Sequence, residues 1–176
     1  MDIPDKLARF ERTIMPCLDA AHNLARWLTR NDHDAEDLVQ EAALRAFRYF
    51  ESFRGERGRQ WLLKIVRSTF YTRREKEQVN ELREPMSEAT LEIAGHEVGP
   101  EEAAQRHETA LLLSNAIEEL PLEFREVLVL REFEGCSYRE IADTVNVPIG
   151  TVMSRLARAR EHLRQQFAGT DAGAHL

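Results

Sequence analysis

The most constraining part of the sequence is the stretch Cys136–Leu163, CSYREIADTVNVPIGTVMSRLARAREHL. Ser137 followed by Glu140 makes a capping box that starts a helix, and Asn146 tolerates the left-handed conformation that ends one. Pro148 suits the first turn of a second helix, where no backbone N–H is needed. The stretch therefore predicts two helices joined by a tight turn, which is the arrangement of a helix-turn-helix DNA-binding motif.

Apolar and basic residues of the second predicted helix fall on different faces. Because the N-terminal part of a recognition helix reaches base edges in the major groove, we expect Ser154, Arg155 and Arg158 to read bases. Other polar side chains are better placed for phosphates, which position the protein without specifying sequence. These are Thr151, Arg160 and the preceding Arg139. A surface helix whose arginines are only solvated is the alternative, and the cap, turn, Pro and basic face in one window favour DNA binding.

Hydrophobic periodicity is helical almost throughout, with no alternating strand run and no Asn-Gly hairpin signal. We therefore expect an all-α protein. A length of 176 residues allows one or two domains with real cores. No secretory segment and no apolar run of membrane-spanning length is recognisable, so no membrane insertion is expected.

Cysteine and histidine usage bears on several kinds of site. Cys17 and Cys136 are too few for a disulfide framework, so both are expected to be buried or half-buried thiols in a reducing cytoplasm. The 6 His residues are scattered without ligand spacing, so no metal is expected. No phosphate loop or nucleophile elbow occurs either, and we expect no cofactor and no enzyme activity.

The net charge of −7 is unusual for a DNA-binding protein, but the charges are unevenly distributed. Residues 53–76 carry a large excess of Arg and Lys, and residues 150–167 carry a smaller one, whereas residues 77–108 are rich in Glu. Two basic segments therefore flank an acidic one. The layout of charge matters more than the total for binding polyanions.

The first part of the chain is expected to form a helical domain over residues 1–76. Residues 5–30 predict one or two helices that Pro16 interrupts. After a turn, Asp34 is expected to cap the next helix. The inner face of that helix carries apolar residues at helical spacing, which are Leu38, Ala42, Ala46 and Phe50, together with Val39, Ala43 and Phe47.

The second part is expected to be a linker followed by another helical domain. Residues 77–104 are Glu-rich with weak periodicity, which predicts a flexible linker. A domain over residues 105–168 then begins with helices at about His107–Glu119 and Leu122–Phe133, ahead of the helix-turn-helix. Residues 169–176 predict a frayed tail.

Basic and aromatic residues are mixed just after the first predicted loop. The loop FRGERG, Phe53–Gly58, precedes a basic helix over about Arg59–Lys76. Single-stranded nucleic acid needs cations for its phosphates and rings for its unstacked bases. Trp61 and Phe70 are more simply explained as core residues. The contact candidates are Arg54, Arg57, Arg59, Lys64, Arg67, Tyr71, Arg73 and Arg74.

The segment DAEDLVQEAALRAF, Asp34–Phe47, predicts a helix with an acidic outer face. Taken alone, this face is best explained as a solvated helix start, because acidic residues favour the N-terminal turn. Its polar members are Asp34, Asp37, Gln40 and Glu41.

Two long stretches resemble bacterial sigma factors of the extracytoplasmic-function group. DAEDLVQEAALRAFRYFESFRGERGRQWLLKIVR is similar to the first conserved domain of that group, and LPLEFREVLVLREFEGCSYREIADTVNVPIGTVMSRLARAREHLR to the second. They cover well over half the chain in the expected order. Two departures stand out: Met153 replaces a Lys that similar proteins often carry, and Ser68–Arg74 is more aromatic than the common pattern. The preferred base is therefore not predicted.

The resemblance implies a role for each part. The Asp34–Phe47 helix would dock on the clamp of the largest subunit of RNA polymerase. FRGERG and the following basic helix would capture an extruded base of the minus-ten element and hold the opened strand. The C-terminal domain would read the minus-thirty-five element as duplex and meet the polymerase flap on the second-largest subunit. An anti-sigma factor is a further expected partner.

Two other functions compete with this interpretation. A LuxR-type regulator has a similar C-terminal helix-turn-helix, but it would carry an α/β ligand or phosphoacceptor domain that this sequence lacks. A sigma-mimicking decoy that binds an anti-sigma factor would suit the acidic net charge. The two basic segments and the absence of a receiver domain argue against a decoy.

Overall fold

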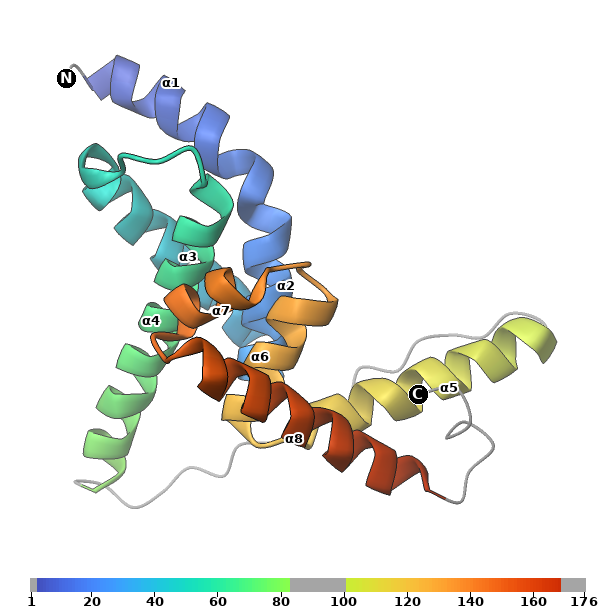
Figure 1. Ribbon diagram of the computed structural model, residues 1–176. Helices are drawn as coiled ribbons and strands as arrows, with labels where there is room; N and C mark the ends of the chain where they lie inside the picture. Colours follow the sequence, from blue (N-terminus) through green and yellow to red (C-terminus); the bar gives the residue numbers. More distant parts are fainter. Residues whose placement is uncertain (1–2, 83–100, 169–176) are drawn as a thin grey trace.

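The computed structural model describes residues 3–82 and 101–168, and no strand occurs within these ranges. The all-α prediction is confirmed. The N-terminal domain packs helices connected by short turns, as Figure 1 shows in blue to green. Its elements are α1 (Ile3–Ile14), a 3₁₀ turn (Met15–Cys17), α2 (Leu18–Thr29), α3 (Asp32–Tyr49), a second 3₁₀ turn (Phe50–Ser52) and α4 (Gly58–Glu81).

Local sequence signals account for most boundaries in this domain. Pro16 lies in the 3₁₀ turn that separates α1 from α2, as predicted. On the predicted inner face of α3, Leu38, Ala42 and Ala46 are buried, and Phe50 is buried in the 3₁₀ turn that follows, whereas the other three members are half-buried. The predicted cap at Asp34 is wrong, because the side chain of Asn31 accepts the hydrogen bond from the Asp34 backbone N–H and α3 already begins at Asp32. Arg30 adopts a left-handed φ of 58°, which ends α2 just before that cap.

The C-terminal domain contains α5 (Glu101–Glu118), α6 (Leu122–Glu132), α7 (Tyr138–Val145) and α8 (Ile149–Phe167). The helix-turn-helix is confirmed as α7 and α8, with the Ser137–Glu140 capping box formed and Asn146 left-handed at φ 56°. Pro148 is the N-cap of α8 and lies just before its first turn.

Two boundaries differ from the sequence-based expectation. α4 continues past Lys76 to Glu81, and α5 begins at Glu101, so both helices extend into the predicted linker. The rest of that linker, residues 83–100, and the predicted tail at 169–176 lie outside the described residues.

The two domains pack against each other. α2 contacts α6 and α4 contacts α7, so the C-terminal helices lie across the middle of the N-terminal domain (Figure 1). Trp27 of α2 lies 5.2 Å from Phe133, measured between ring centroids. This arrangement places the basic face of α4 beside acidic residues of α6 and of the loop before α7.

Candidate nucleic-acid interface

The FRGERG loop is anchored by aromatic side chains. Phe53 stacks on Phe50 with ring centroids 5.8 Å apart, and it lies 5.0 Å from Trp61. Phe50 in turn packs edge-on against Phe10 of α1. Trp61 is thus one of the residues that pack on the core, as expected. The rings fix the loop while its polar side chains remain outside.

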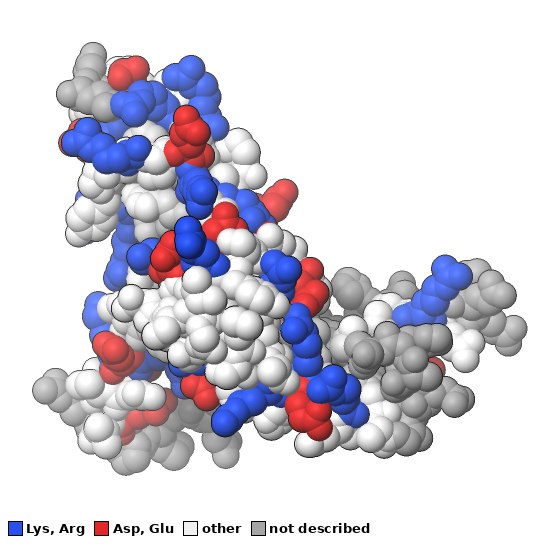
Figure 2. All heavy atoms as spheres, viewed as in Figure 1, with Lys and Arg blue, Asp and Glu red and all other residues white. Residues whose placement is uncertain are grey.

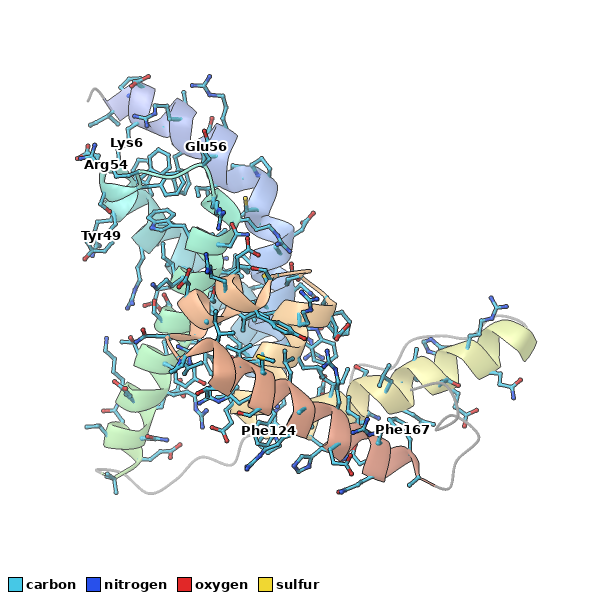
Figure 3. The ribbon with its side chains drawn as sticks, in the orientation of Figure 1. Lys6, Tyr49, Arg54, Glu56, Phe124 and Phe167 are labelled. Atoms are coloured by element: carbon cyan, nitrogen blue, oxygen red, sulfur yellow. The ribbon has the colours of Figure 1, made fainter. Side chains whose placement is uncertain are left out.

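A basic cavity lies between this loop and α1. Its volume is about 730 Å³. Its lining includes Gly55, Gly58 and five arginines, which are Arg9, Arg12, Arg54, Arg57 and Arg59. Figure 3 labels Arg54 and Glu56 along the loop, and Figure 2 shows blue side chains gathered at this end of the molecule. The sequence analysis missed Arg9 and Arg12, because nothing in α1 suggests that its basic residues face a distant loop.

The middle of the basic α4 face is engaged by the C-terminal domain. Arg67 donates hydrogen bonds of 2.8 and 3.0 Å to the two carboxylate oxygens of Glu126, and the Tyr71 hydroxyl donates to the same carboxylate at 3.3 Å. Burial is the largest single influence on the pKa of Arg67 and lowers it, but the hydrogen bonds and negative charge of Glu126, with those of Tyr71, together raise that pKa. Burial and the negative charge of Glu126 raise the pKa of Tyr71.

The start of α4 is engaged in the same way. Arg59 binds the carboxylate of Glu134 at 2.5 Å and also donates to the Glu134 backbone carbonyl. Arg57 lies 3.8 Å from the carboxylate of Glu140. The predicted strand-binding residues therefore lie along the loop and α4, and several of them hold carboxylates of the C-terminal domain.

The remaining predicted strand-binding residues form no hydrogen bond or ion pair with the acidic residues of the C-terminal domain described above. Arg73 lies 3.5 Å from Glu41 of α3, and the guanidinium of Arg74 lies over the Phe70 ring at 5.7 Å. Lys64 and Arg54 are exposed. The predicted set thus runs from the loop to the second half of α4, and we call it the α4 strip. Within it, Arg73 turns toward α3, whereas Arg67 and Tyr71 turn toward α6.

The acidic outer face of α3 is largely open. Asp34, Asp37 and Gln40 are exposed, whereas Glu41 is half-buried and pairs with Arg45 at 3.0 Å. Leu44 lies one helical turn beyond Gln40 and is 71% exposed, and the sequence analysis did not single it out. A single exposed Leu is ordinary on a protein surface, and Leu44 is of interest here because it adjoins the predicted acidic face.

On α8 the predicted base-reading residues differ in their surroundings. Ser154 and Arg158 are exposed, and the Ser154 hydroxyl donates to the Thr151 backbone carbonyl. Arg155 is half-buried, with its guanidinium 3.7 Å from Glu123 and 3.9 Å from Glu126. The front of the molecule over α7 and the beginning of α8 is mostly uncharged in Figure 2.

The predicted phosphate-contacting residues lie around this helix. Arg139 is exposed and Thr151 is half-buried. Arg160 hydrogen-bonds Glu132 at 2.9 Å, and this bond raises the pKa of Arg160. Among the described residues, none of these three side chains forms a hydrogen bond or ion pair with the N-terminal domain.

An apolar groove of about 320 Å³ lies on the C-terminal domain, away from the α4 face. Apolar side chains of α5, α6 and α8 line it, among them Leu113, Leu128 and Leu163. Phe133 at its edge is 49% exposed. Such a groove is suited to an apolar helix of a partner protein.

Comparison with known proteins places this geometry in a family. Residues 13–79 match the family Sigma-70 region 2, and residues 110–163 match Sigma-70, region 4. RNA polymerase sigma-H factor of Pseudomonas aeruginosa is 36% identical over 153 residues, which cover 80% of this chain and 78% of that protein. The chain belongs to the ECF sigma factors of RNA polymerase.

Other relatives agree with this assignment. ECF RNA polymerase sigma factor SigE of Mycolicibacterium smegmatis is 35% identical over 85% of this chain, although the match spans only 58% of that relative. The co-crystal structure of the sigma factor RpoE in complex with the anti-sigma factor NepR from Bartonella quintana aligns with a TM-score of 0.76 and 26% identity. That alignment covers 92% of this chain and 98% of the other.

Membership in the family settles the general function. The sigma factor directs promoter-specific initiation of transcription by RNA polymerase, binds core polymerase and promoter DNA, and is not itself a catalyst. The region 2 match excludes the LuxR-type alternative, which would have a different N-terminal half. In the described ranges no helix is long and apolar enough to span a membrane, and no His, Cys, Asp or Glu cluster suits a metal ion.

Proposed function

We propose that the basic cavity beside the FRGERG loop receives an extruded base of the minus-ten element, and that the α4 strip holds the phosphates of the opened strand. The observation that carries this proposal is the cavity of about 730 Å³ ringed by arginines from two separate elements. Aromatic anchoring of the loop supports it, because a preorganised pocket captures a base at lower entropic cost. Arg57 and Arg59 contribute to both the cavity and the strip.

The outer face of α3 is the proposed docking surface for the clamp of the largest polymerase subunit. Asp37 and Gln40 supply polar contacts to a basic partner, and the exposed Leu44 supplies the apolar contact that interfaces concentrate near their centre. Asp34 and Glu41 border this surface.

The C-terminal domain is proposed to bind the minus-thirty-five element through α8. Ser154, Arg155 and Arg158 are the base-reading candidates on that helix. Arg139, Thr151 and Arg160 are proposed to contact phosphates. The apolar groove between α5, α6 and α8 is the proposed surface for the flap of the second-largest subunit. An anti-sigma factor remains a proposed partner, and the cytoplasm is the proposed location, where polymerase and promoter are found.

The test begins with run-off transcription with core polymerase on genomic templates, which maps a start site. Binding of the protein to the pre-melted minus-ten strand of that promoter is then measured. Arg57→Ala, in the cavity, is compared with Lys76→Ala, which removes an exposed cation further along α4. We expect Arg57→Ala to weaken binding of the pre-melted minus-ten strand, and Lys76→Ala to behave like wild type. Equal losses in both variants would contradict the role of the cavity.

A further inference from the structure

We propose that the C-terminal domain of the free sigma factor competes with the opened promoter strand for the cationic face of α4. Glu126, Glu134 and Glu140 take the places of strand phosphates in this competition. The competition presupposes that the α4 face binds the strand, as proposed above. It makes the free chain its own inhibitor of strand binding.

Glu126 joins cations from both nucleic-acid surfaces. Its side chain is 1% exposed, binds Arg67 and Tyr71 of the N-terminal domain, and lies 3.9 Å from Arg155 of the recognition helix. A carboxylate this deeply buried is stable only where cations and hydrogen-bond donors surround it. Glu126 therefore contacts side chains proposed to bind the minus-ten strand and also an arginine proposed to bind the upstream duplex.

Glu134 and Glu140 extend the contact toward the basic cavity. Glu134, before α7, accepts hydrogen bonds from Asn23 and Arg59 at 2.5 Å each. Glu140 accepts a hydrogen bond of 3.0 Å from Gln60, while its other oxygen completes the cap of α7. Along this boundary, cationic and amide side chains of the N-terminal domain therefore face carboxylates of the C-terminal domain.

Carboxylates and phosphates present the same chemistry to an arginine, since both offer paired anionic oxygens to its N–H groups. An arginine bonded to Glu126 or Glu134 is not available to a phosphate, so strand binding requires the domains to separate. The apparent affinity for the strand is then reduced by the fraction of molecules that are open. Asp37 and Leu44 remain exposed in the closed arrangement, so the proposed polymerase surface is not blocked by it.

The test uses the full chain without polymerase. The probe is a short fluorescent single-stranded DNA carrying the non-template minus-ten sequence of a promoter mapped by run-off transcription. We expect Glu126→Gln/Glu134→Gln to bind this probe about tenfold more tightly than wild type, because fewer molecules remain closed. Small-angle X-ray scattering of the same variant should give a larger radius of gyration.

Glu134→Gln alone keeps the test valid if loss of Glu126 disturbs the fold of α6. The Glu134 side chain accepts hydrogen bonds from Asn23 and Arg59, so the single variant should show a smaller gain in both readouts. The matched control is Glu119→Gln/Glu161→Gln. It removes the same charge from contacts with Gln166 and Arg164 inside the C-terminal domain, and it should match wild type.

Three outcomes oppose the competition. Equal probe affinity for wild type and both opening variants would overturn it, as would an unchanged radius of gyration. A gain in the control as large as in the double variant would attribute the effect to net charge alone. Failure of wild-type holoenzyme to initiate in the run-off assay would instead contradict the function, which separates the two claims.

Discussion

Gly58 lies directly against Thr13: a Cβ atom on Gly58 would be 2.8 Å from the Thr13 Cγ2 atom and 3.0 Å from its carbonyl oxygen. Gly58 opens α4 at the end of the FRGERG loop, so this close approach sets the distance between the loop and α1. The second glycine of the loop is thus required for packing. Gly55 meets its nearest neighbours only at 3.6 Å, which is ordinary contact.

Gly58→Ala is therefore expected to destabilise the N-terminal domain by about 1–3 kcal/mol, since a tightly packed contact must be pushed apart. Gly55→Ala is the matched control and should change the free energy of unfolding much less. Urea unfolding of both variants, followed by strand binding, checks this. Similar free energies of unfolding for the two variants would show that α1 can move away at Thr13 without destabilising the domain.

Leu44→Asp is expected to weaken binding to core polymerase by about ten- to a hundredfold while the fold is retained. Burial of a Leu side chain contributes about 1.5–3 kcal/mol at an interface, and each tenfold in affinity corresponds to about 1.4 kcal/mol. Leu82→Asp is the control, because Leu82 is 89% exposed at the end of α4. A titration with labelled core polymerase measures both, and equal affinities would argue against this face of α3.

Arg155→Ala and Arg158→Ala should change which upstream sequence is preferred. A good bidentate contact between Arg and guanine contributes about 1–3 kcal/mol of discrimination. Their defect should persist on a pre-melted promoter that still depends on the upstream element. Arg59→Ala and Tyr71→Ala should instead be partly rescued by pre-melting. If pre-melting instead rescued the Arg155 and Arg158 variants and not the Arg59 and Tyr71 variants, the roles assigned to the two domains would be wrong.

Cys136 should be alkylated slowly and with an unusual pH dependence. It is 0% exposed, and burial raises its pKa although nearby Arg59 opposes the shift. Because this pKa is raised, the thiol favours the folded over the unfolded chain fully below its ordinary pKa, and that contribution is lost as pH rises through the raised value. The rate of iodoacetamide labelling of a Cys17→Ser variant, followed by mass spectrometry, should therefore keep rising at pH values where the rate of an ordinary thiol has levelled off. A rate profile like that of the unfolded chain would contradict this.

Local signals in the sequence predicted the helix-turn-helix well, because Ser137, Glu140 and Asn146 act on neighbouring backbone groups. The start of α3 was misplaced for a related reason. Asn31 and Asp34 are both good caps, and the choice between them depends on the left-handed Arg30, which the sequence does not reveal. Boundaries set by one unusual backbone conformation escape pattern analysis.

The association of the domains was not predictable from sequence patterns. In the sequence Glu126 and Glu134 look like ordinary solvated acids, and their partners Arg67 and Arg59 lie in the other domain. Nothing in helical periodicity links residues so far apart. The arginines of α1 in the basic cavity were missed for the same reason, whereas the α4 candidates were found from their own composition.

The shared use of the α4 arginines has a consequence for how such a chain evolves. A substitution at Arg67 or Arg59 alters two opposing equilibria at once, because each cation serves a carboxylate in the closed chain and a proposed phosphate in the open one. Substitutions of these arginines therefore cannot change the affinity for the strand without also changing the closure of the two domains. Selection can adjust the threshold for opening through Glu126, Glu134 and Glu140 while the strand contacts stay constant. We expect these acidic positions to vary among related sigma factors more freely than the arginines they hold.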